Sequence, residues 1–218
     1  RSGAVPTVDD ALTLQASTMD NLFSMLIHEV LEQQPEAIQT FLKASSVLRI
    51  MTPPACDAIL QRHDSAALLT YLQRQDLFVV DLGNGSLRYQ HIFHQLLQQQ
   101  VEDDQGQHWH SRACDHYTNQ GDIESAIYHA FQARDHDRAA HLLSAYGGDL
   151  LRAGRLDSLG SHLDALPPEK LITHPALLKH LGDLARLRSQ FQESLGWYQQ
   201  AEALWREKGQ TAQVGRAL

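Results

Sequence analysis

An internal repeat in the second half of the chain limits the possible folds more than any other feature. Residues 121–126, 154–159 and 189–194 can be aligned on the turn residues Gly121, Gly154 and Ser189. These turn residues lie 33 and 35 positions apart, close to the roughly 34-residue length of a helix-turn-helix repeat. Each such helix pair has an apolar face that only a neighbouring pair can cover. The sequence therefore predicts antiparallel helix pairs stacked one on the next.

The repeats also place small and aromatic residues where paired helices would touch. Twelve positions past their turns, the first and third repeats carry Ala133 and Ala201, and closely packed helices need small residues at such contacts. Tyr117 and Gly182 fall where the leading helix of a repeat meets its partner. The third repeat is the most similar to a TPR unit, and the second is degenerate. We expect TPR-like repeats over residues 103–218, wound as a right-handed α-superhelix and incomplete at the C-terminal end.

Upstream of the repeats, the apolar residues follow a helical period. Residues 1–16 are polar, have no sustained period and are expected to be a linker. An amphipathic helix is expected from Ser17 or Thr18 to residue 31, and further helices at 35–47, at 55–60 and from Asp64 or Ser65 onward. Pro35 is expected at the first helical position. The buried positions predicted for the second and fourth of these helices are Ile38, Phe41, Leu42, Leu68, Leu69 and Leu72.

A hairpin is expected between the last of these helices and the next one. Residues 77–81 and 87–89 are rich in β-branched and aromatic side chains, and residues 83–86 form a turn-prone cluster between them. Another helix is expected to start at His91. Several helices followed by one hairpin and a helix is the element order of a winged helix, with the hairpin as the wing. The predicted fold class is mainly α, with a winged-helix-like module over residues 17–102.

Composition excludes several classes of function. The 218 residues carry a formal net charge of −8, so the chain has no general attraction to nucleic-acid phosphates or anionic membranes. No apolar run approaches the roughly 18 residues that span a bilayer, and the N-terminus lacks a signal-peptide pattern. We therefore expect a cytoplasmic protein without a membrane or direct nucleic-acid partner. Cys56 and Cys114 have no CxxC partner and are expected to be packing residues.

Three stretches of the chain resemble one protein family. They are residues 35–48, residues 68–79 continuing into 88–97, and residues 110–130. In this order they are similar to the MalT-like branch of the STAND signal-transduction ATPases, which are large bacterial regulators that often end in a LuxR-type DNA-binding domain. The resemblance implies a position downstream of an NTPase domain of the same chain, with the winged helix as its lid. It also implies that the superhelix receives a small-molecule or protein effector.

The sequence departs from the complete family pattern. It has no GxxxxGK[ST] phosphate loop and no C-terminal helix-turn-helix. It begins without Met and stops within a helical pattern, so we interpret it as an excised segment. The segment itself is then expected to be non-enzymatic and to hold no cofactor of its own, whereas the parent protein would bind and hydrolyse ATP.

His91 is the predicted site residue. It follows the second strand of the hairpin and opens a helix. In related STAND proteins, the histidine of the corresponding motif contacts the β-phosphate of ADP, so the resemblance implies that His91 senses ADP together with the NTPase domain. An imidazole N–H can donate to a phosphate oxygen, and a helix N-terminus adds positive potential. The alternative is a half-buried structural histidine at a strand-to-helix junction.

No pattern indicates catalysis or a metal centre. Motifs such as GxSxG, HExxH and the EF-hand loop are absent from the sequence, and no catalytic residue is predicted. His108, His110, Cys114 and His116 form the only cluster that resembles a zinc site. Only His110 and Cys114 share a helix face by their spacing. No metal ligand is therefore predicted.

Three functions remain open at this point. The leading hypothesis is a regulatory segment that couples the nucleotide state of an NTPase domain to effector sensing by the helical repeats. The alternative is a TPR-type scaffold for protein–protein interaction without a nucleotide role. Direct DNA binding is a third possibility, but Asp64 and Asp76 offset Arg74 around the expected recognition helix.

Overall fold

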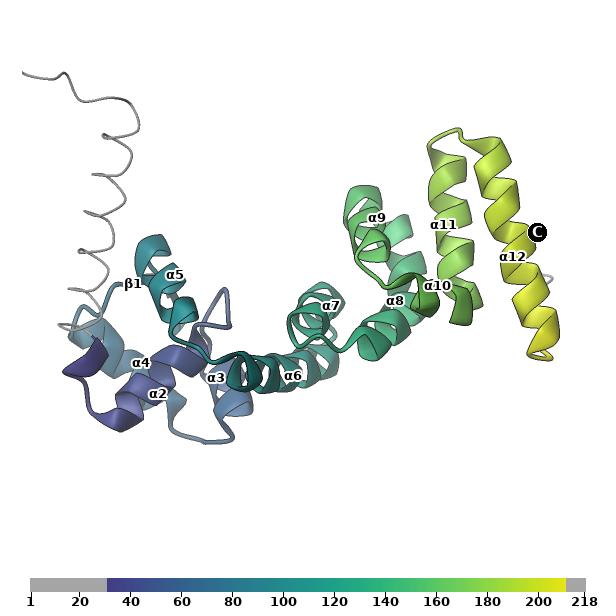
Figure 1. The fold of residues 1–218 in the computed structure, drawn as a ribbon. Helices are drawn as coiled ribbons and strands as arrows, with labels where there is room; N and C mark the ends of the chain where they lie inside the picture. The colour runs from purple at the N-terminus through teal and green to yellow at the C-terminus, as the bar shows by residue number, and fades with distance from the viewer. Residues whose placement is uncertain (1–30, 211–218) are drawn as a thin grey trace, which may run out of the picture. The chain divides into compact units, whose positions relative to one another are not determined.

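The structure, a computed structural model, describes residues 31–210 and divides the chain into two units, Arg1–Trp109 and His110–Leu218 (Figure 1). The expected linker over residues 1–16 lies outside the described residues, as does the helix expected from Ser17 or Thr18 except for its last residue. The two units are described separately below.

Helices α2 (Glu36–Ser45), α3 (Pro53–Leu60) and α4 (Ser65–Arg74) begin the described part of the first unit. Their ends follow from local sequence. Thr52 caps α3 by accepting a hydrogen bond from the Ala55 amide, and Pro53 occupies the first helical position, where no amide hydrogen is needed. Two details differ from the predictions: Pro35 precedes α2 as its N-cap, and Leu68 on α4 is only half-buried.

A two-stranded antiparallel hairpin follows, formed by β1 (Val79–Gly83) and β2 (Ser86–Tyr89). Asn84 and Gly85 make the two-residue turn with φ values of 53° and 73°. Two positive φ angles are typical of the type I′ turn, whose twist suits the right-handed twist of the strands. An isolated bridge between Met51 and Leu87 adds a third backbone segment beside β2. The predicted hairpin is therefore confirmed, but its first strand begins at Val79 and not at residue 77, because Phe78 has a positive φ of 50°.

Helix α5 (His91–Gln99) follows the hairpin and packs against the core of the first unit. Phe93, Leu96 and Leu97 of α5 are buried, as are Phe41 and Leu42 of α2. The helical spacing of these residues brings one apolar face of each helix inward. Both cysteines are free and buried, Cys56 in this unit and Cys114 in the second, and burial raises the pKa of the Cys56 thiol to about 12.

The second unit is helical throughout its described residues. Helix α6 begins at Asp103, directly after the predicted boundary at residue 102, and the division between the units falls within it. The helices are α6 (Asp103–Gln120), α7 (Ile123–Gln132), α8 (His136–Arg152), α9 (Leu156–Asp164), α10 (Pro168–Thr173), α11 (Pro175–Leu187) and α12 (Phe191–Glu207). Together with the hairpin of the first unit, they confirm the predicted fold class.

The three aligned turn residues have the same backbone conformation. Gly121, Gly154 and Ser189 have φ values of 76°, 73° and 62°. At each turn, the amide of the following residue bonds to a carbonyl five residues earlier, as in the Asp122-to-Tyr117 bond of 3.0 Å. This is the Schellman arrangement, which ends a helix with one left-handed residue. The three aligned turn residues therefore follow the ends of α6, α8 and α11. Each of these is the first helix of a pair, and the pairs are α6–α7, α8–α9 and α11–α12.

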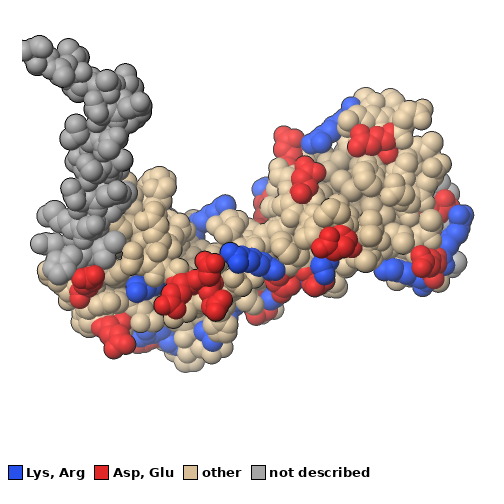
Figure 2. All heavy atoms as spheres, in the orientation of Figure 1, with Lys and Arg blue, Asp and Glu red and all other residues tan. Residues whose placement is uncertain are grey.

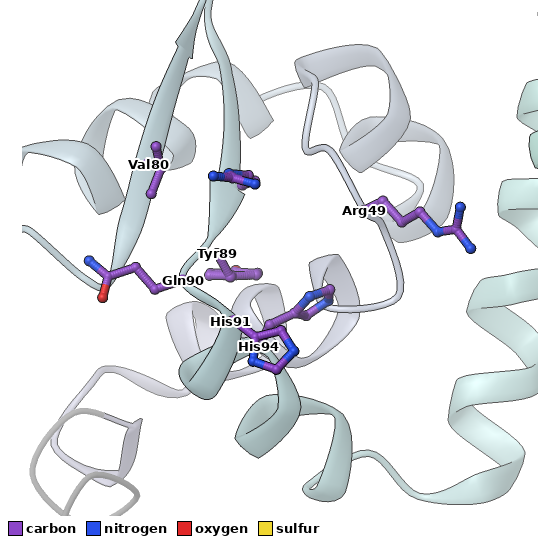
Figure 3. Close-up of a pocket in the computed structure, with 7 residues that line it drawn as sticks. Arg49, Val80, Tyr89, Gln90, His91 and His94 are labelled. Carbon is purple, nitrogen blue, oxygen red and sulfur yellow. The ribbon is translucent and has the colours of Figure 1, made fainter.

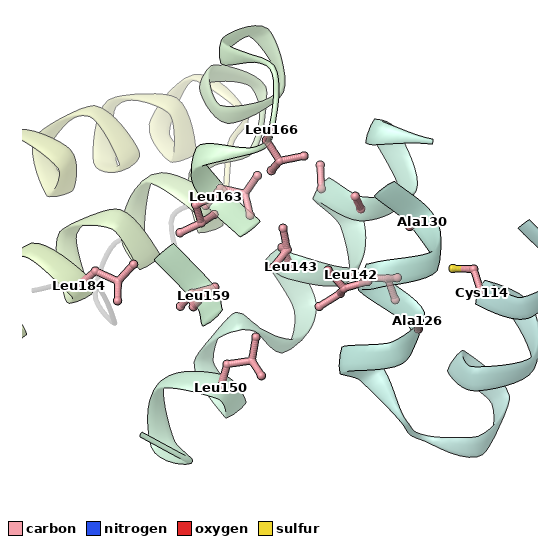
Figure 4. Close-up of a cluster of buried hydrophobic side chains, with 14 residues drawn as sticks. Cys114, Ala126, Ala130, Leu142, Leu143, Leu150, Leu159, Leu163, Leu166 and Leu184 are labelled. Atoms are coloured by element: carbon pink, nitrogen blue, oxygen red, sulfur yellow. The ribbon is translucent and has the colours of Figure 1, made fainter. Parts of the chain in front are cut away.

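One apolar core connects α6, α7, α8, α9 and α11 (Figure 4), and a smaller cluster of Leu178, Ala201 and Trp205 packs α12 against α11. The larger core is built mostly of leucine and alanine, including Leu143 on α8 and Leu159 on α9, both fully buried. The degenerate second repeat contains an extra short helix, α10, none of whose residues is buried. Ala201 lies buried within α12 as expected, whereas Ala133 is the half-buried C-cap of α7. No helix of the described residues has the length and apolar character that crossing a membrane requires.

Candidate functional site

His91 is the first residue of α5 and is exposed to solvent. The preceding residue, Gln90, anchors this helix start to the hairpin, because its amide donates to the Phe78 carbonyl over 2.7 Å. No side chain caps the first turn of α5. Helix N-termini leave amide donors without intrahelical partners and carry partial positive charge. His91 therefore stands at a helix end that suits an anion, and it is not the half-buried histidine of the alternative interpretation.

A cavity of about 390 Å³ lies in front of this helix start (Figure 3). Such a volume is within the usual range of small-molecule sites. Its lining combines imidazole, guanidinium, amide, phenol and aliphatic groups, and none of the lining residues is acidic. The lining residues are Arg49, Val80, Arg88, Tyr89, Gln90, His91 and His94.

The second histidine of the cavity, His94, is held by a backbone carbonyl. Its Nε2 atom lies 2.6 Å from the Ser46 carbonyl oxygen, which also accepts a bond of 3.2 Å from the side-chain amide of Gln98. Because a carbonyl only accepts, the proton of a neutral His94 ring is on Nε2. The rings of His91 and His94 lie near each other at the start of α5 (Figure 3).

The two arginines line the cavity from different segments. Arg88 on β2 pairs directly with Val80 on β1, so the two side chains are on the same face of the hairpin, and both line the cavity. Arg49 comes from the segment between α2 and α3, and its guanidinium points away from the two imidazoles in Figure 3. The cationic group contributed from the hairpin is therefore Arg88.

Tyr89 fixes the buried wall of the cavity. Its hydroxyl lies 2.6 Å from the Ser45 hydroxyl, and its ring meets Phe93 edge-on with centroids 5.7 Å apart. Burial raises the pKa of the Tyr89 phenol above its usual range, so this phenol stays neutral. With a neutral wall and basic side chains, the cavity can bind an anion.

The histidines of α6 form a different arrangement from a zinc cluster. His108 is exposed, Cys114 is buried, and no group of three or more metal-ligating side chains occurs among the residues that the structure describes. His110 instead pairs with His129 of α7, with 2.8 Å between their Nδ1 atoms. The Tyr117 ring stacks on His129 with an interplanar angle of 6°. Sequence reasoning missed His129, because only its burial on α7 reveals the pairing.

Charged side chains of both signs are mixed on the face that Figure 2 shows. Several arginines of the second unit form ion pairs, including Arg138 with Asp115 and Arg155 with Glu124. Exposed pairs of this kind contribute little to stability. No continuous basic surface is seen on this face, which does not favour the possibility of duplex DNA binding.

The comparisons with known proteins point to one family. The model of the MalT winged helix domain matches residues 27–109. The HTH-type transcriptional regulator MalT of Vibrio parahaemolyticus is 26% identical over 162 residues, which cover 72% of this chain and 18% of that protein. The regulator of the same name from Serratia proteamaculans is 26% identical over 219 residues, which cover 95% of this chain and 23% of that protein. The chain thus spans about a fifth of the length of the relatives it matches.

Proposed function

We propose that this chain is a regulatory segment of an ATP-dependent transcriptional regulator, because the model of the MalT winged helix domain matches residues 27–109. In this function, the winged helix packs as a lid on an upstream NTPase domain and reports its nucleotide state to the helical repeats. The repeats receive the effector, a small molecule or a protein. The segment performs no reaction itself.

One observation carries the proposal: His91 stands at the uncapped start of α5, in a cavity whose lining has no acidic residue. A neutral or protonated imidazole can donate to a phosphate oxygen, and the helix end favours the same charge. Bound ADP would then hold the lid closed, since its β-phosphate contacts both domains. Effector binding to the repeats would favour the open state by its higher affinity for that state.

The test is ADP retention by a longer protein that includes the NTPase domain. His91→Ala removes the phosphate donor, and we expect ADP to dissociate about tenfold faster, as for the loss of one charge-assisted hydrogen bond. Release of bound radiolabelled ADP on dilution into unlabelled ADP measures this rate. His63→Ala is the matched control, because His63 is an exposed histidine of the same unit outside the cavity. Equal retention by both variants would refute the sensing role of His91.

The alternative function, a protein-interaction scaffold, is favoured by an exposed apolar surface on the last helix pair. Phe191 and Leu195 of α12 are 66% and 52% exposed, one helical turn apart. Exposed apolar patches mark interaction sites or repeat-to-repeat contacts. Unchanged ADP retention in the His91 variant, together with loss of a bound protein in Phe191→Ser, would select this function.

A further inference from the structure

We propose that a cavity of the second unit docks an arginine side chain of a partner protein. The cavity has a volume of about 410 Å³ and is lined by residues from the start of α7 and from the end of α8. The inference rests on the proposed function in one respect, that the helical repeats receive an effector. It goes further by locating the contact and by naming the chemistry of the partner.

The next repeat contains an arginine of its own at the corresponding place. Arg188 directly precedes the turn residue Ser189, and its guanidinium lies 3.5 Å from the carboxylate of Asp157 near the start of α9. A Cβ atom at Gly160 of α9 would lie 3.3 Å from the same guanidinium. The arginine at the end of α11 therefore extends across the first turns of α9.

The second repeat has a small residue where the third has this arginine. The residue directly before its turn glycine, Gly154, is Ala153, which lines the cavity. The acidic group is nevertheless present, because Glu124 lies three positions after its turn residue, as Asp157 does in the next repeat. The cavity thus has the carboxylate that Arg188 contacts in the next repeat, but a methyl group in place of the guanidinium.

The lining of the cavity suits a guanidinium group from outside. Its acidic residues are Asp122, Glu124 and Asp149, whereas Arg155 is its basic residue. Tyr146 adds an aromatic ring and is 37% exposed. A planar guanidinium can stack on such a ring while its forked N–H groups bond to carboxylates, which the compact ammonium group of lysine cannot do. The lining therefore favours arginine over lysine.

Two of the carboxylates keep acceptor sites for a further donor. Glu124 is paired with Arg155, and Asp149 is paired with Arg152 of the same helix. A carboxylate has about four lone-pair sites, so one arginine does not saturate either of them. Asp122 is the N-cap of α7 and already accepts two hydrogen bonds. We therefore assign the docking contact to Glu124 and Asp149.

The experiment is an NMR titration of the whole chain with acetyl-arginine amide, whose blocked ends present the side chain as a protein does. We expect saturable chemical-shift changes of the Tyr146 ring. The citrulline derivative has nearly the same shape without the charge, so it should bind about tenfold more weakly or less. Free arginine should also bind more weakly than the blocked derivative, because its carboxylate meets an acidic cavity.

Ala153→Arg should weaken binding by about tenfold or more, because the new side chain fills the cavity as Arg188 crosses α9 in the next repeat. The matched control is Ala203→Arg, which makes the same change at an exposed alanine of α12 outside the cavity. Asp149→Asn is a second variant, which removes a charge at an exposed position and should also weaken binding. Thermal melts should show that all three variants remain folded.

The proposal is overturned if the arginine derivative gives no saturable shifts of Tyr146, or if the citrulline derivative binds equally well. It is also overturned if Ala203→Arg weakens binding as much as Ala153→Arg, or if Asp149→Asn leaves binding unchanged. Tighter binding of free arginine than of the blocked derivative would indicate a metabolite site and reject the protein partner. ADP retention that depends on His91, without arginine binding, would reject the docking site alone. The opposite pair of results would keep the docking site and reject the lid role.

Discussion

Two glycines of the second unit make room for aromatic rings of the neighbouring helix. A Cβ atom at Gly147 would lie 2.6 Å from Cδ2 of His180, and a Cβ atom at Gly182 would lie 2.6 Å from Cε1 of Tyr198. The second ring cannot move freely, because the Tyr198 hydroxyl donates to Asp183 over 2.8 Å. Helices α11 and α12 therefore approach closely at Gly182.

Gly182→Ala should destabilise the second unit by about 1–3 kcal/mol, since the new methyl group requires the Tyr198 ring or the helices to shift. Urea unfolding followed by circular dichroism measures the change. Gly196→Ala on α12 is the matched control, because its Cβ would meet nothing within 4 Å. The control should be neutral or stabilising by up to about 1 kcal/mol, owing to the better helix propensity of alanine. Equal effects of both substitutions would contradict the close approach.

The helix pairs depend on a left-handed residue at the end of each leading helix. Gly121 and Gly154 meet this requirement without steric cost, whereas Ser189 adopts a φ of 62° with a side chain present. Serine at such a position is strained by about 1 kcal/mol relative to glycine. The third turn is therefore less favourable than the first two, although its hydrogen bonds are the same.

We expect Ser189→Gly to stabilise the second unit by about 0.5–1 kcal/mol, and Gly154→Ser to destabilise it by a similar amount. The first substitution gives the third turn the glycine of the second turn, and the second substitution does the reverse. Their effects on the free energy of unfolding should therefore have opposite signs. The midpoints of urea unfolding give both values. Shifts of the same sign would show that backbone conformation does not control these turns.

On the scale of the whole molecule, half-buried histidines of the second unit make its stability depend on pH. Burial lowers the pKa of His110 to about 4, and the same cause lowers the pKa values of His116 and His162. His110 is also bonded to His129, and the two Nδ1 atoms can share only one proton. The neutral form of His110 is therefore the one that the folded unit accommodates.

The unit should lose stability as the pH falls from about 6.5 to about 4. An unfolded histidine has a pKa near 6.5, above the folded value of His110, so the unfolded chain binds more protons in this window. The stabilisation is complete above about pH 6.5, and the loss attributable to His110 should be about 1–3 kcal/mol. Urea unfolding at pH 7 and at pH 5 measures the slope.

His110→Gln should reduce this slope without abolishing it, because His116 and His162 contribute in the same direction. The exposed His108 supplies the control, and His108→Gln should leave the slope unchanged. A slope that is the same in both variants would exclude His110 as the responsible group.

The elements of this protein follow from its sequence because they depend on short-range preferences. Apolar spacing predicts α2 and α4, the turn-prone cluster at residues 83–86 predicts the hairpin, and the 33- and 35-residue spacing predicts the turns of the repeats. These features are set by backbone conformation and by side chains a few residues apart. The resemblance to MalT-like regulators, carried by ordered blocks of residues, is confirmed by the winged helix match.

Only the tertiary structure decided which side chains meet. His94 bonds to Ser46, 48 residues away in sequence, and this contact holds one wall of the cavity beside His91. The sequence placed His110 on the same helix face as Cys114. In the structure, the His110 ring instead contacts His129 of the neighbouring helix α7. Such meetings depend on how distant segments pack and on the exact rotation of each helix, which local periodicity does not specify.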